Sequence, residues 1–349
     1  MHMADALISP LVGGSLWVAT AGVGTYSVNK VKSVLDEKKI PLMGVMGAFI
    51  FAAQMINFSI PGTGSSGHLG GGLLLAILLG PYAGFLTMAS ILTIQALFFA
   101  DGGLLALGCN IINLGFYTCF VAYPLIYKPI TSGKTTPKRI FVASMIASIL
   151  GLQMGSFSVV LETFLSGMSD LSLSSLLVVM QSIHLAIGVV EGLVVSAVVT
   201  YVWRTRPEIV DQTVYEKLSG SQTYRKVVVV FLILTVLVGG ILSWFASSNP
   251  DGLEWSMLKV TGTEHYETTS SVEAKTQNIQ DKTALLPDYN FKETNTGASE
   301  NAGDGTSSKF GTSVSGLVGG TITLVLVGLI GLGINKLKKK HNSSSLSYK

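Results

Sequence analysis

Charged residues are scarce in this sequence. They make up 12% of its 349 residues, whereas a typical soluble domain has roughly 25%. Hydrophobic residues make up 48% and are gathered in long runs. These runs are too continuous for the strands of a membrane β-barrel, which alternate in polarity over about 10 residues. The composition therefore predicts an all-α integral membrane protein, because a helix satisfies its own backbone hydrogen bonds in lipid.

Cysteine is almost absent as well. Cys109 and Cys119 lie in one apolar run, and this number and spacing indicate neither a disulfide framework nor a zinc site. The net charge of +3 comes with basic clusters beside apolar segments, a membrane pattern, so no nucleic-acid partner is expected. The first lysine is Lys30, so no basic region precedes the first apolar run and a cleaved secretory signal is not expected.

The apolar runs predict the number of membrane spans when about 20 residues are allowed for each. We expect a helical bundle of seven transmembrane helices followed by two further ones, with a break at Gly80-Pro81. The expected spans are residues 9–27, 40–57, 68–80, 83–100, 106–127, 140–166, 175–202, 226–247 and 314–335. The expected organisation is a first module over 1–205, a linker over 206–225, a two-span module over 226–335 and a basic tail over 336–349.

Basic residues orient this arrangement. Of the 23 lysines and arginines, 18 fall on one side of a nine-span chain: Lys30, Lys32, Lys38, Lys39, Lys128, Lys134, Lys138, Arg139, Arg204, Arg206, Lys217, Arg225, Lys226, Lys336, Lys338, Lys339, Lys340 and Lys349. The other five lie in the long 248–313 loop, and long loops cross membranes largely regardless of charge. The 18 therefore mark the cytoplasm. We expect an extracytoplasmic N-terminus and a cytoplasmic C-terminus.

The first two residues can chelate a metal ion. The sequence begins Met1-His2, and a free terminal amine, the His2 amide nitrogen and the His2 imidazole can close fused chelate rings. Nitrogen ligands in a square plane suit Ni(II) or Cu(II). Deprotonation of an amide needs a strongly polarising ion, which makes magnesium and calcium poor candidates.

A second histidine is expected on the same outer face. Residues 58–67 are rich in glycine and serine and contain Pro61, so we expect an irregular loop there. His68 follows directly and opens the third apolar segment. This loop is where a fourth nitrogen ligand could come from.

Several polar groups lie in or beside the apolar segments, where ionisable residues are costly and default to a functional role. The alternative is a structural role, in which they form hydrogen bonds between helices. Asp101, Asn110 and Asn113 are candidates for supporting the metal loop. The full set of candidates for such support is Asp5, Ser66, Asp101, Asn110, Asn113, His184 and Glu191, and Glu162 is a further ionisable residue within a span.

Two other functions deserve comparison. The stretch Gly64-Ser65-Ser66-Gly67 matches the pattern of rhomboid-type intramembrane serine proteases, with His184 as a candidate base. That alternative leaves Met1-His2 and the 248–313 loop unexplained. An ion channel or a secondary transporter is the other alternative, but the sequence shows no convincing repeat and its polar residues gather at the outer face rather than at the midplane.

The chain resembles the substrate-binding (S) component of nickel/cobalt energy-coupling-factor (ECF) transporters, the NikM/CbiM family. The resemblance rests on the stretch from Met1 to Pro10, on Ser66-Gly67-His68-Leu69, and on three further stretches at 48–58, 97–103 and 188–193. Residues 226–349 resemble the small NikN/CbiN component, which carries the motif Pro250-Asp251-Gly252-Leu253-Glu254. We expect the 248–313 loop to be poorly ordered in its middle, with an amphipathic stub near its start, and the tail after Lys336 to be disordered.

The resemblance implies a function. The chain would bind Ni(2+), or alternatively Co(2+), as transported substrate through the Met1 amine, the His2 amide and imidazole, and His68. The fusion and the Met-Ala-Asp-Ala start resemble the nickel branch. The resemblance implies as partners a transmembrane coupling (T) subunit, cytoplasmic ATPase (A) subunits and the lipid bilayer. No G-x-x-x-x-G-K-[ST] phosphate-binding motif occurs here, so ATP hydrolysis is expected to come from another protein. The chain is thus expected to be a transporter subunit of a prokaryotic cell membrane and not an enzyme.

Overall fold

The computed structural model describes residues 2–34, 39–167, 172–210, 224–262, 270–292 and 305–346. Within these ranges the secondary structure is helical apart from one two-stranded hairpin. The first module contains η1 (Asp5–Leu7), α1 (Pro10–Val34), α2 (Ile40–Gln54), β1 (Phe58–Ile60), β2 (Ser65–Gly67), α3 (Gly72–Leu79), α4 (Pro81–Phe99), α5 (Leu107–Ile111), η3 (Ile112–Tyr127), α6 (Lys128–Thr131), α7 (Pro137–Leu165), α8 (Leu173–Thr205) and α9 (Pro207–Val210). The second contains α11 (Arg225–Gly240), η4 (Leu242–Phe245), α12 (Gly252–Thr261), α13 (Ser271–Thr283), η5 (Pro287–Tyr289) and α14 (Gly305–Leu346).

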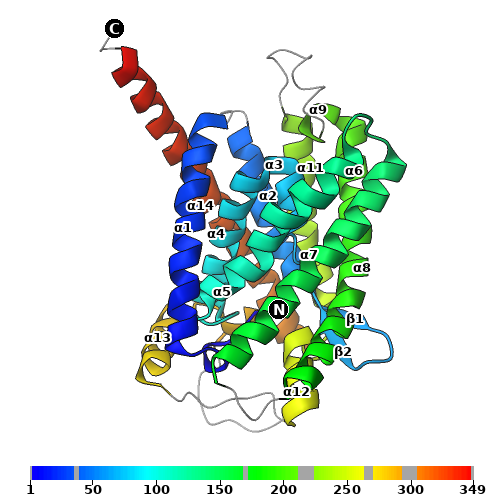
Figure 1. Ribbon diagram of the computed structural model, residues 1–349, viewed down its shortest axis with the longest axis vertical. Helices are drawn as coiled ribbons and strands as arrows, with labels where there is room; N and C mark the ends of the chain where they lie inside the picture. Colours follow the sequence, from blue (N-terminus) through cyan, green and yellow to red (C-terminus); the bar gives the residue numbers. More distant parts are fainter. Residues whose placement is uncertain are drawn as a thin grey trace.

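The long helices run along the long axis of the molecule, and α12, α13 and the hairpin cover one end (Figure 1). Among the described residues, five helical stretches are long and apolar enough to cross a membrane: 81–99, 107–131, 137–165, 173–205 and 309–339. The shorter α2 is also apolar. The prediction of an all-α membrane protein is confirmed, while the count of seven plus two spans stays a prediction.

The predicted break between the third and fourth segments is present. Gly80 has a φ of +88° and separates α3 from α4, which begins at Pro81. The fifth segment is less regular than expected, because α5 continues into the π-helix η3. Pro124 lies inside η3, and its ring nitrogen cannot donate a backbone hydrogen bond.

The expectation of an irregular loop at 58–67 was wrong. Phe58 pairs with Gly67 and Ile60 with Ser65 in an antiparallel hairpin. Gly62 and Gly64 form its turn with positive φ, a conformation that glycine adopts without steric cost. Glycine therefore allows the turn here instead of preventing regular structure.

Two further expectations of disorder were wrong. Residues 271–283 of the long loop form α13, whose Ser270 and Glu273 make a reciprocal capping box, an arrangement that satisfies two otherwise unpaired backbone donors. The stub near the start of the loop is the helix α12. The tail after Lys336 continues α14 as far as Leu346, and the lysines there are good helix formers. Residues 211–223, 263–269 and 293–304 of the linker and the loop lie outside the described residues.

The second module packs against the first through α2, which contacts both α11 and α14. Gly319 of α14 allows the closest part of this approach. A Cβ atom at Gly319 would lie 2.1 Å from Cζ of Phe51 and 2.8 Å from Cζ of Phe99. Both aromatic rings also contact the ring of Tyr289 in η5.

Replacing Gly319 with leucine should push α14 away from Phe51 and Phe99. Overpacking of a well-packed interface costs about 1–3 kcal/mol, so we expect a lower apparent melting temperature in detergent. Gly328→Leu on the same helix is the matched control, because a Cβ atom there meets nothing within 4 Å. Equal melting temperatures for the two variants would contradict this account of the interface.

Candidate metal site

The N-terminal segment is clamped inside the molecule by its main chain. The Met3 N–H donates to Asn110 Oδ1 at 2.8 Å, and Asn110 Nδ2 donates to the Met3 carbonyl at 3.2 Å. The Gly103 N–H donates to the same carbonyl at 2.8 Å. The Met3 side chain is fully buried in a cluster that includes Leu253 and Met257 of α12. Met1 itself lies outside the described residues.

Asp5 supports this segment from the other side. Its Oδ1 accepts a hydrogen bond from the Ala106 N–H at 3.0 Å, and its Oδ2 accepts one from the Thr276 hydroxyl of α13. A Cβ atom at Gly103 would lie 1.9 Å from Asp5 Oδ1, so glycine is required there. Asp5 thus anchors the turn of η1, which fixes where His2 enters the site.

His2 and His68 meet in a buried position. Their rings are stacked with centroids 4.9 Å apart and planes 6° apart, and only 7% of the His2 side chain is exposed. Burial, reinforced by neighbouring positive charge including that of His2, lowers the pKa of His68 to about 3. His68 is therefore neutral at physiological pH, and neutral imidazole is the form that binds a metal ion.

Asp101 contacts His2 directly. Ala100 ends α4 in the left-handed conformation, and Asp101 Oδ1 then lies 3.0 Å from His2 Nδ1. Burial by itself would raise the pKa of the Asp101 carboxyl, but the charge and hydrogen bond of His2 outweigh burial and lower it. The other ring nitrogen, His2 Nε2, is buried and has no hydrogen-bond partner among the described residues.

The turn that follows His68 is fixed by three helices. Glu191 of α8 accepts hydrogen bonds from the N–H groups of Gly70 and Gly71 at 2.8 and 3.1 Å. Gln54 of α2 donates to the Gly70 carbonyl at 2.8 Å, and Gln95 of α4 donates to Gln54 at 3.0 Å. Glu191 therefore supports the histidine-bearing turn through its backbone.

Ser66, His184 and Asn113 have structural partners of their own. The Ser66 hydroxyl donates to the Asn249 carbonyl at 2.8 Å, which fastens the hairpin to the start of the long loop. His184 Nδ1 lies 2.8 Å from the Met180 carbonyl, and its ring packs against Gly252. Asn113 donates to Glu162 at 2.8 Å and lies 3.9 Å from the Met3 sulfur. None of these contacts forms the serine–histidine pair that a protease would need.

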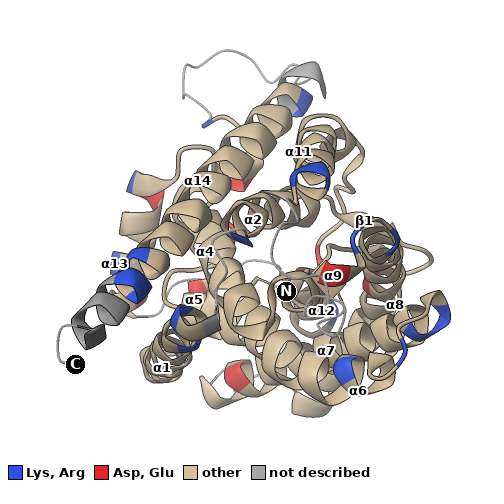
Figure 2. Ribbon diagram, turned by 90° about the horizontal axis from the view of Figure 1, so that it is seen from above, with Lys and Arg blue, Asp and Glu red and all other residues tan. Residues whose placement is uncertain are grey.

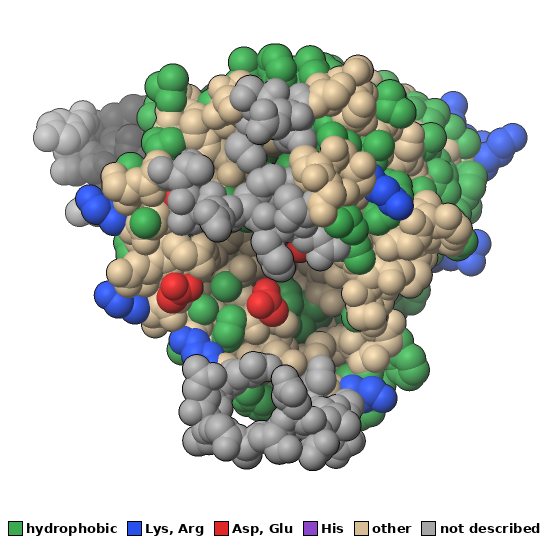
Figure 3. All heavy atoms as spheres, turned by 90° about the horizontal axis from the view of Figure 1, so that it is seen from below, with side chains coloured by type: hydrophobic (Ala, Val, Ile, Leu, Met, Phe, Trp, Pro, Cys, Tyr) green, Lys and Arg blue, Asp and Glu red, His purple; other side chains and the backbone are tan. Residues whose placement is uncertain are grey.

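The two histidines face an acidic cavity of about 380 Å³ at the end of the bundle that α12 and α13 cover. Its lining includes Asp5, Asp101, Asp251, Glu254 and Asp288, and none of the described lining residues is a lysine or an arginine. Figure 3 shows acidic side chains beside a hollow on this face. A cavity lined by one sign of charge concentrates ions of the opposite sign, so it attracts cations.

The lining also includes residues that were not among the predicted site residues. Asp251 caps α12 by accepting hydrogen bonds from the Leu253 and Glu254 N–H groups, both at 2.8 Å. Burial would raise the pKa of Asp251, but nearby positive charge and the hydrogen bond from the Glu254 N–H lower it. Tyr289 and Gln54 were also missed. The sequence signal for Gln54 was an isolated amide in an apolar run, whereas no sequence pattern marked Tyr289.

The fold and the site define a class: helical, multi-pass membrane proteins whose histidine-containing acidic cavity suits a metal cation. Residues 2–209 match the family described as "Cobalt uptake substrate-specific transmembrane region", and residues 225–336 match the PDGLE domain. The chain belongs to this family of metal transport proteins, as a fused component in which a NikM/CbiM part is followed by a NikN-like part.

Similar proteins agree with this assignment. The putative fused nickel transport protein NikMN of Archaeoglobus fulgidus is 31% identical over 93% of this chain and 96% of its own length. The cobalt transport protein CbiM of Geobacter sulfurreducens is 26% identical over 76% of this chain and 78% of its own. A crystal structure of a transition metal transporter, 30% identical, matches with a TM-score of 0.54 and covers 63% of this chain and 100% of the other.

Asn110→Ala should weaken metal binding without touching a proposed ligand. The variant loses both hydrogen bonds to the Met3 main chain, and loss of partners that orient ligands typically costs 10–100-fold in affinity. We expect Ni(II) or Co(II) affinity, measured by titration calorimetry in detergent, to fall about 10-fold. Asn113→Ala removes the same buried amide nearby and should have a smaller effect. Equal losses would show that the clamp on Met3 is not the cause.

Proposed function

We propose that this chain is the substrate-capture subunit of an ATP-driven nickel importer of the ECF type. The observation that carries the proposal is the parallel pair His2 and His68, with ring centroids 4.9 Å apart. Both histidines line the acidic cavity, and the hydrogen bond from Met3 to Asn110 holds the N-terminal segment beside it.

Side chains alone do not account for a binding site. Among the described residues, no group of three or more His, Cys, Asp or Glu side chains is placed to hold a metal ion. Two imidazoles therefore need help from main-chain nitrogen. The Met1 amine and the His2 amide complete a set of four nitrogens with the imidazoles of His2 and His68.

This ligand set requires a change at His2. Nδ1 is the ring nitrogen that can close a chelate with the residue's own amide, but here Nδ1 faces Asp101 while Nε2 has no described partner. On binding, the imidazole turns so that Nδ1 meets the ion and Nε2–H donates to Asp101. Donation from the second nitrogen to a carboxylate is the usual arrangement for metal-bound histidine, and it satisfies the buried Nε2.

Nickel is the preferred ion because an all-nitrogen set in a square plane suits Ni(II). A relative over nearly the whole chain is also named as a nickel transport protein. Cobalt is the second candidate, favoured by the family description and by the relative from Geobacter sulfurreducens.

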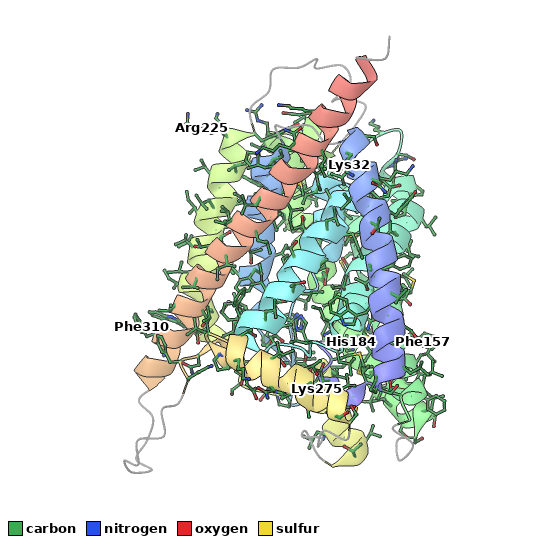
Figure 4. The ribbon with its side chains drawn as sticks, turned by 90° about the vertical axis from the view of Figure 1, so that its left-hand side faces the viewer. Lys32, Phe157, His184, Arg225, Lys275 and Phe310 are labelled. Carbon is green, nitrogen blue, oxygen red and sulfur yellow. The ribbon has the colours of Figure 1, made fainter. Side chains whose placement is uncertain are left out.

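The proposed topology has seven spans, then two, with the site outside the cell. Lys32 and Arg225 lie at one end of the bundle and His184 and Lys275 at the other (Figure 4). Basic residues gather on helix ends at the end away from the site (Figure 2). Since basic loops stay in the cytoplasm, this supports an extracytoplasmic N-terminus and a cytoplasmic C-terminus. The family matches support a boundary within 206–225.

ATP hydrolysis would be supplied by partner subunits. The chain contains no phosphate-binding motif of the Walker type, so T and A subunits of an ECF complex would drive the release of the ion inward. A bound ion alone shifts a conformational equilibrium only by its differential affinity for the two states. The long apolar helices would place the chain in the cell membrane.

Extending the N-terminus by a few residues should abolish Ni(II) binding, because the terminal amine is moved and becomes an amide. His68→Ala should weaken Ni(II) binding by at least about 100-fold, beyond the loss of a supporting partner. Calorimetry and the visible absorption of square-planar Ni(II) report both. The same extension placed at the C-terminus is the control, and Ser66→Ala should keep the absorption band.

Nickel binding by the N-terminally extended chain at native affinity would overturn the ligand model. Uptake of Ni(II) and Co(II) by cells that express the complete complex distinguishes the two ions. Faster Co(II) uptake at equal concentrations would favour the cobalt importer.

A further inference from the structure

Tyr289 has a backbone conformation that bulky residues rarely adopt. Asp288 and Tyr289 have φ angles of +49° and +57°, in the left-handed region, where aromatic side chains are uncommon. Consecutive residues of this kind cost free energy and persist only where the surroundings hold them in place. The contacts around Tyr289 must therefore stabilise this backbone conformation.

The loop is held against the end of α4. The N–H groups of Leu285 and Leu286 both donate to the Phe98 carbonyl, at 2.9 and 3.1 Å. The Tyr289 ring stacks on Phe99 with centroids 5.1 Å apart and meets the edge of Phe51 at 6.2 Å. This packing directs the phenol toward the metal site.

The Tyr289 hydroxyl donates a hydrogen bond to Asp101 Oδ2, while Asp101 Oδ1 contacts His2 Nδ1 at 3.0 Å. Each oxygen of one carboxylate thus has a separate partner. A residue of the second module is joined through Asp101 to a proposed ligand at the start of the first.

We propose that Tyr289 is a positioning residue for metal retention: its hydroxyl orients Asp101, and Asp101 in turn orients the His2 imidazole by accepting from Nε2–H once Nδ1 has turned to the ion. This inference rests on the proposed function, since it takes His2 as a ligand. A carboxylate held at one oxygen presents the other in a fixed direction. Without the phenol, Asp101 can rotate away and the imidazole loses its fixed orientation.

The consequence is a link between the two modules. While η5 is docked on Phe51 and Phe99, Asp101 is oriented and the ion is retained. When η5 leaves, the same hydrogen bond breaks and release of the ion accelerates. The second module therefore contributes to retention without supplying a ligand.

Tyr289→Phe tests the hydroxyl alone, because it keeps the ring that stacks on Phe99. In the full chain with a native N-terminus, we expect Ni(II) affinity to fall about 10-fold, the lower end of the range for partners that orient ligands. Release of Ni(II) to a chelator, followed by stopped-flow absorption, should accelerate by a similar factor. Tyr127→Phe is the matched control, since Tyr127 is buried and borders α6, at the other end of the bundle (Figure 1).

A cycle with Asp101→Asn separates positioning from packing. If Tyr289 acts only through Asp101, the double variant should bind Ni(II) no more weakly than Asp101→Asn alone. Additive losses, or native affinity in Tyr289→Phe, would overturn the proposal. The Ni(II)-induced rise in melting temperature gives a second measurement of binding, and the melting transition of each metal-free variant reports whether it is folded.

Failure of this inference is distinguishable from failure of the proposed function. If Tyr289→Phe binds Ni(II) normally while His68→Ala and the N-terminal extension do not, Tyr289 is not a positioning residue and the ligand set stands. If His68→Ala and the extension also bind normally, the ligand set itself is wrong and Tyr289 has no ligand to position.

Discussion

The main-chain clamp on Met3 is the constraint on which the site depends. Terminal residues of a chain are usually mobile, and the proposed chelate of the first two residues would lose its geometry if they remained so. Asn110 and Gly103 bind both polar groups of the Met3 backbone, and the Met3 side chain is buried between the modules. With residue 3 fixed, the main chain of His2 has little freedom, and its imidazole stacks on that of His68.

The charges around the site favour the binding of a cation, although burial by itself would oppose it. Moving an ion out of water is costly unless opposite charge and hydrogen bonds compensate. Here His68 is held neutral, while the pKa values of Asp101 and Asp251 are lowered against the effect of burial. Asp101 and Asp251 thus keep their negative charge, and the His68 imidazole stays unprotonated. This combination favours a divalent ion over a proton.

Sequence predicted the parts that depend on local pattern. Helical class, the break at Gly80-Pro81, and the placement of His2 and His68 on one face followed from hydropathy, turn residues and charge. The hairpin was missed because a glycine-rich stretch usually predicts an irregular loop, whereas here Gly62 and Gly64 form the turn between two short strands. Tyr289 was missed because its role depends on contacts with Phe99 and Asp101, which are distant in the sequence. No sequence pattern around residue 289 indicates these contacts. Asp5 and Glu191 were expected near the site. The sequence does not show, however, that they act by accepting hydrogen bonds from backbone N–H groups.

Fusion of the two modules gives these long-range contacts a physical advantage. Thr276, Gln280 and Tyr289 from one short stretch of the second module reach Asp5, the Gly102 carbonyl and Asp101, respectively. Individually such hydrogen bonds contribute only about 0.5–3 kcal/mol each. A tether raises the effective concentration of the stretch at the site, so weak contacts suffice to keep it docked. Weak contacts can also be broken by a modest conformational change, as the proposed release of the ion requires.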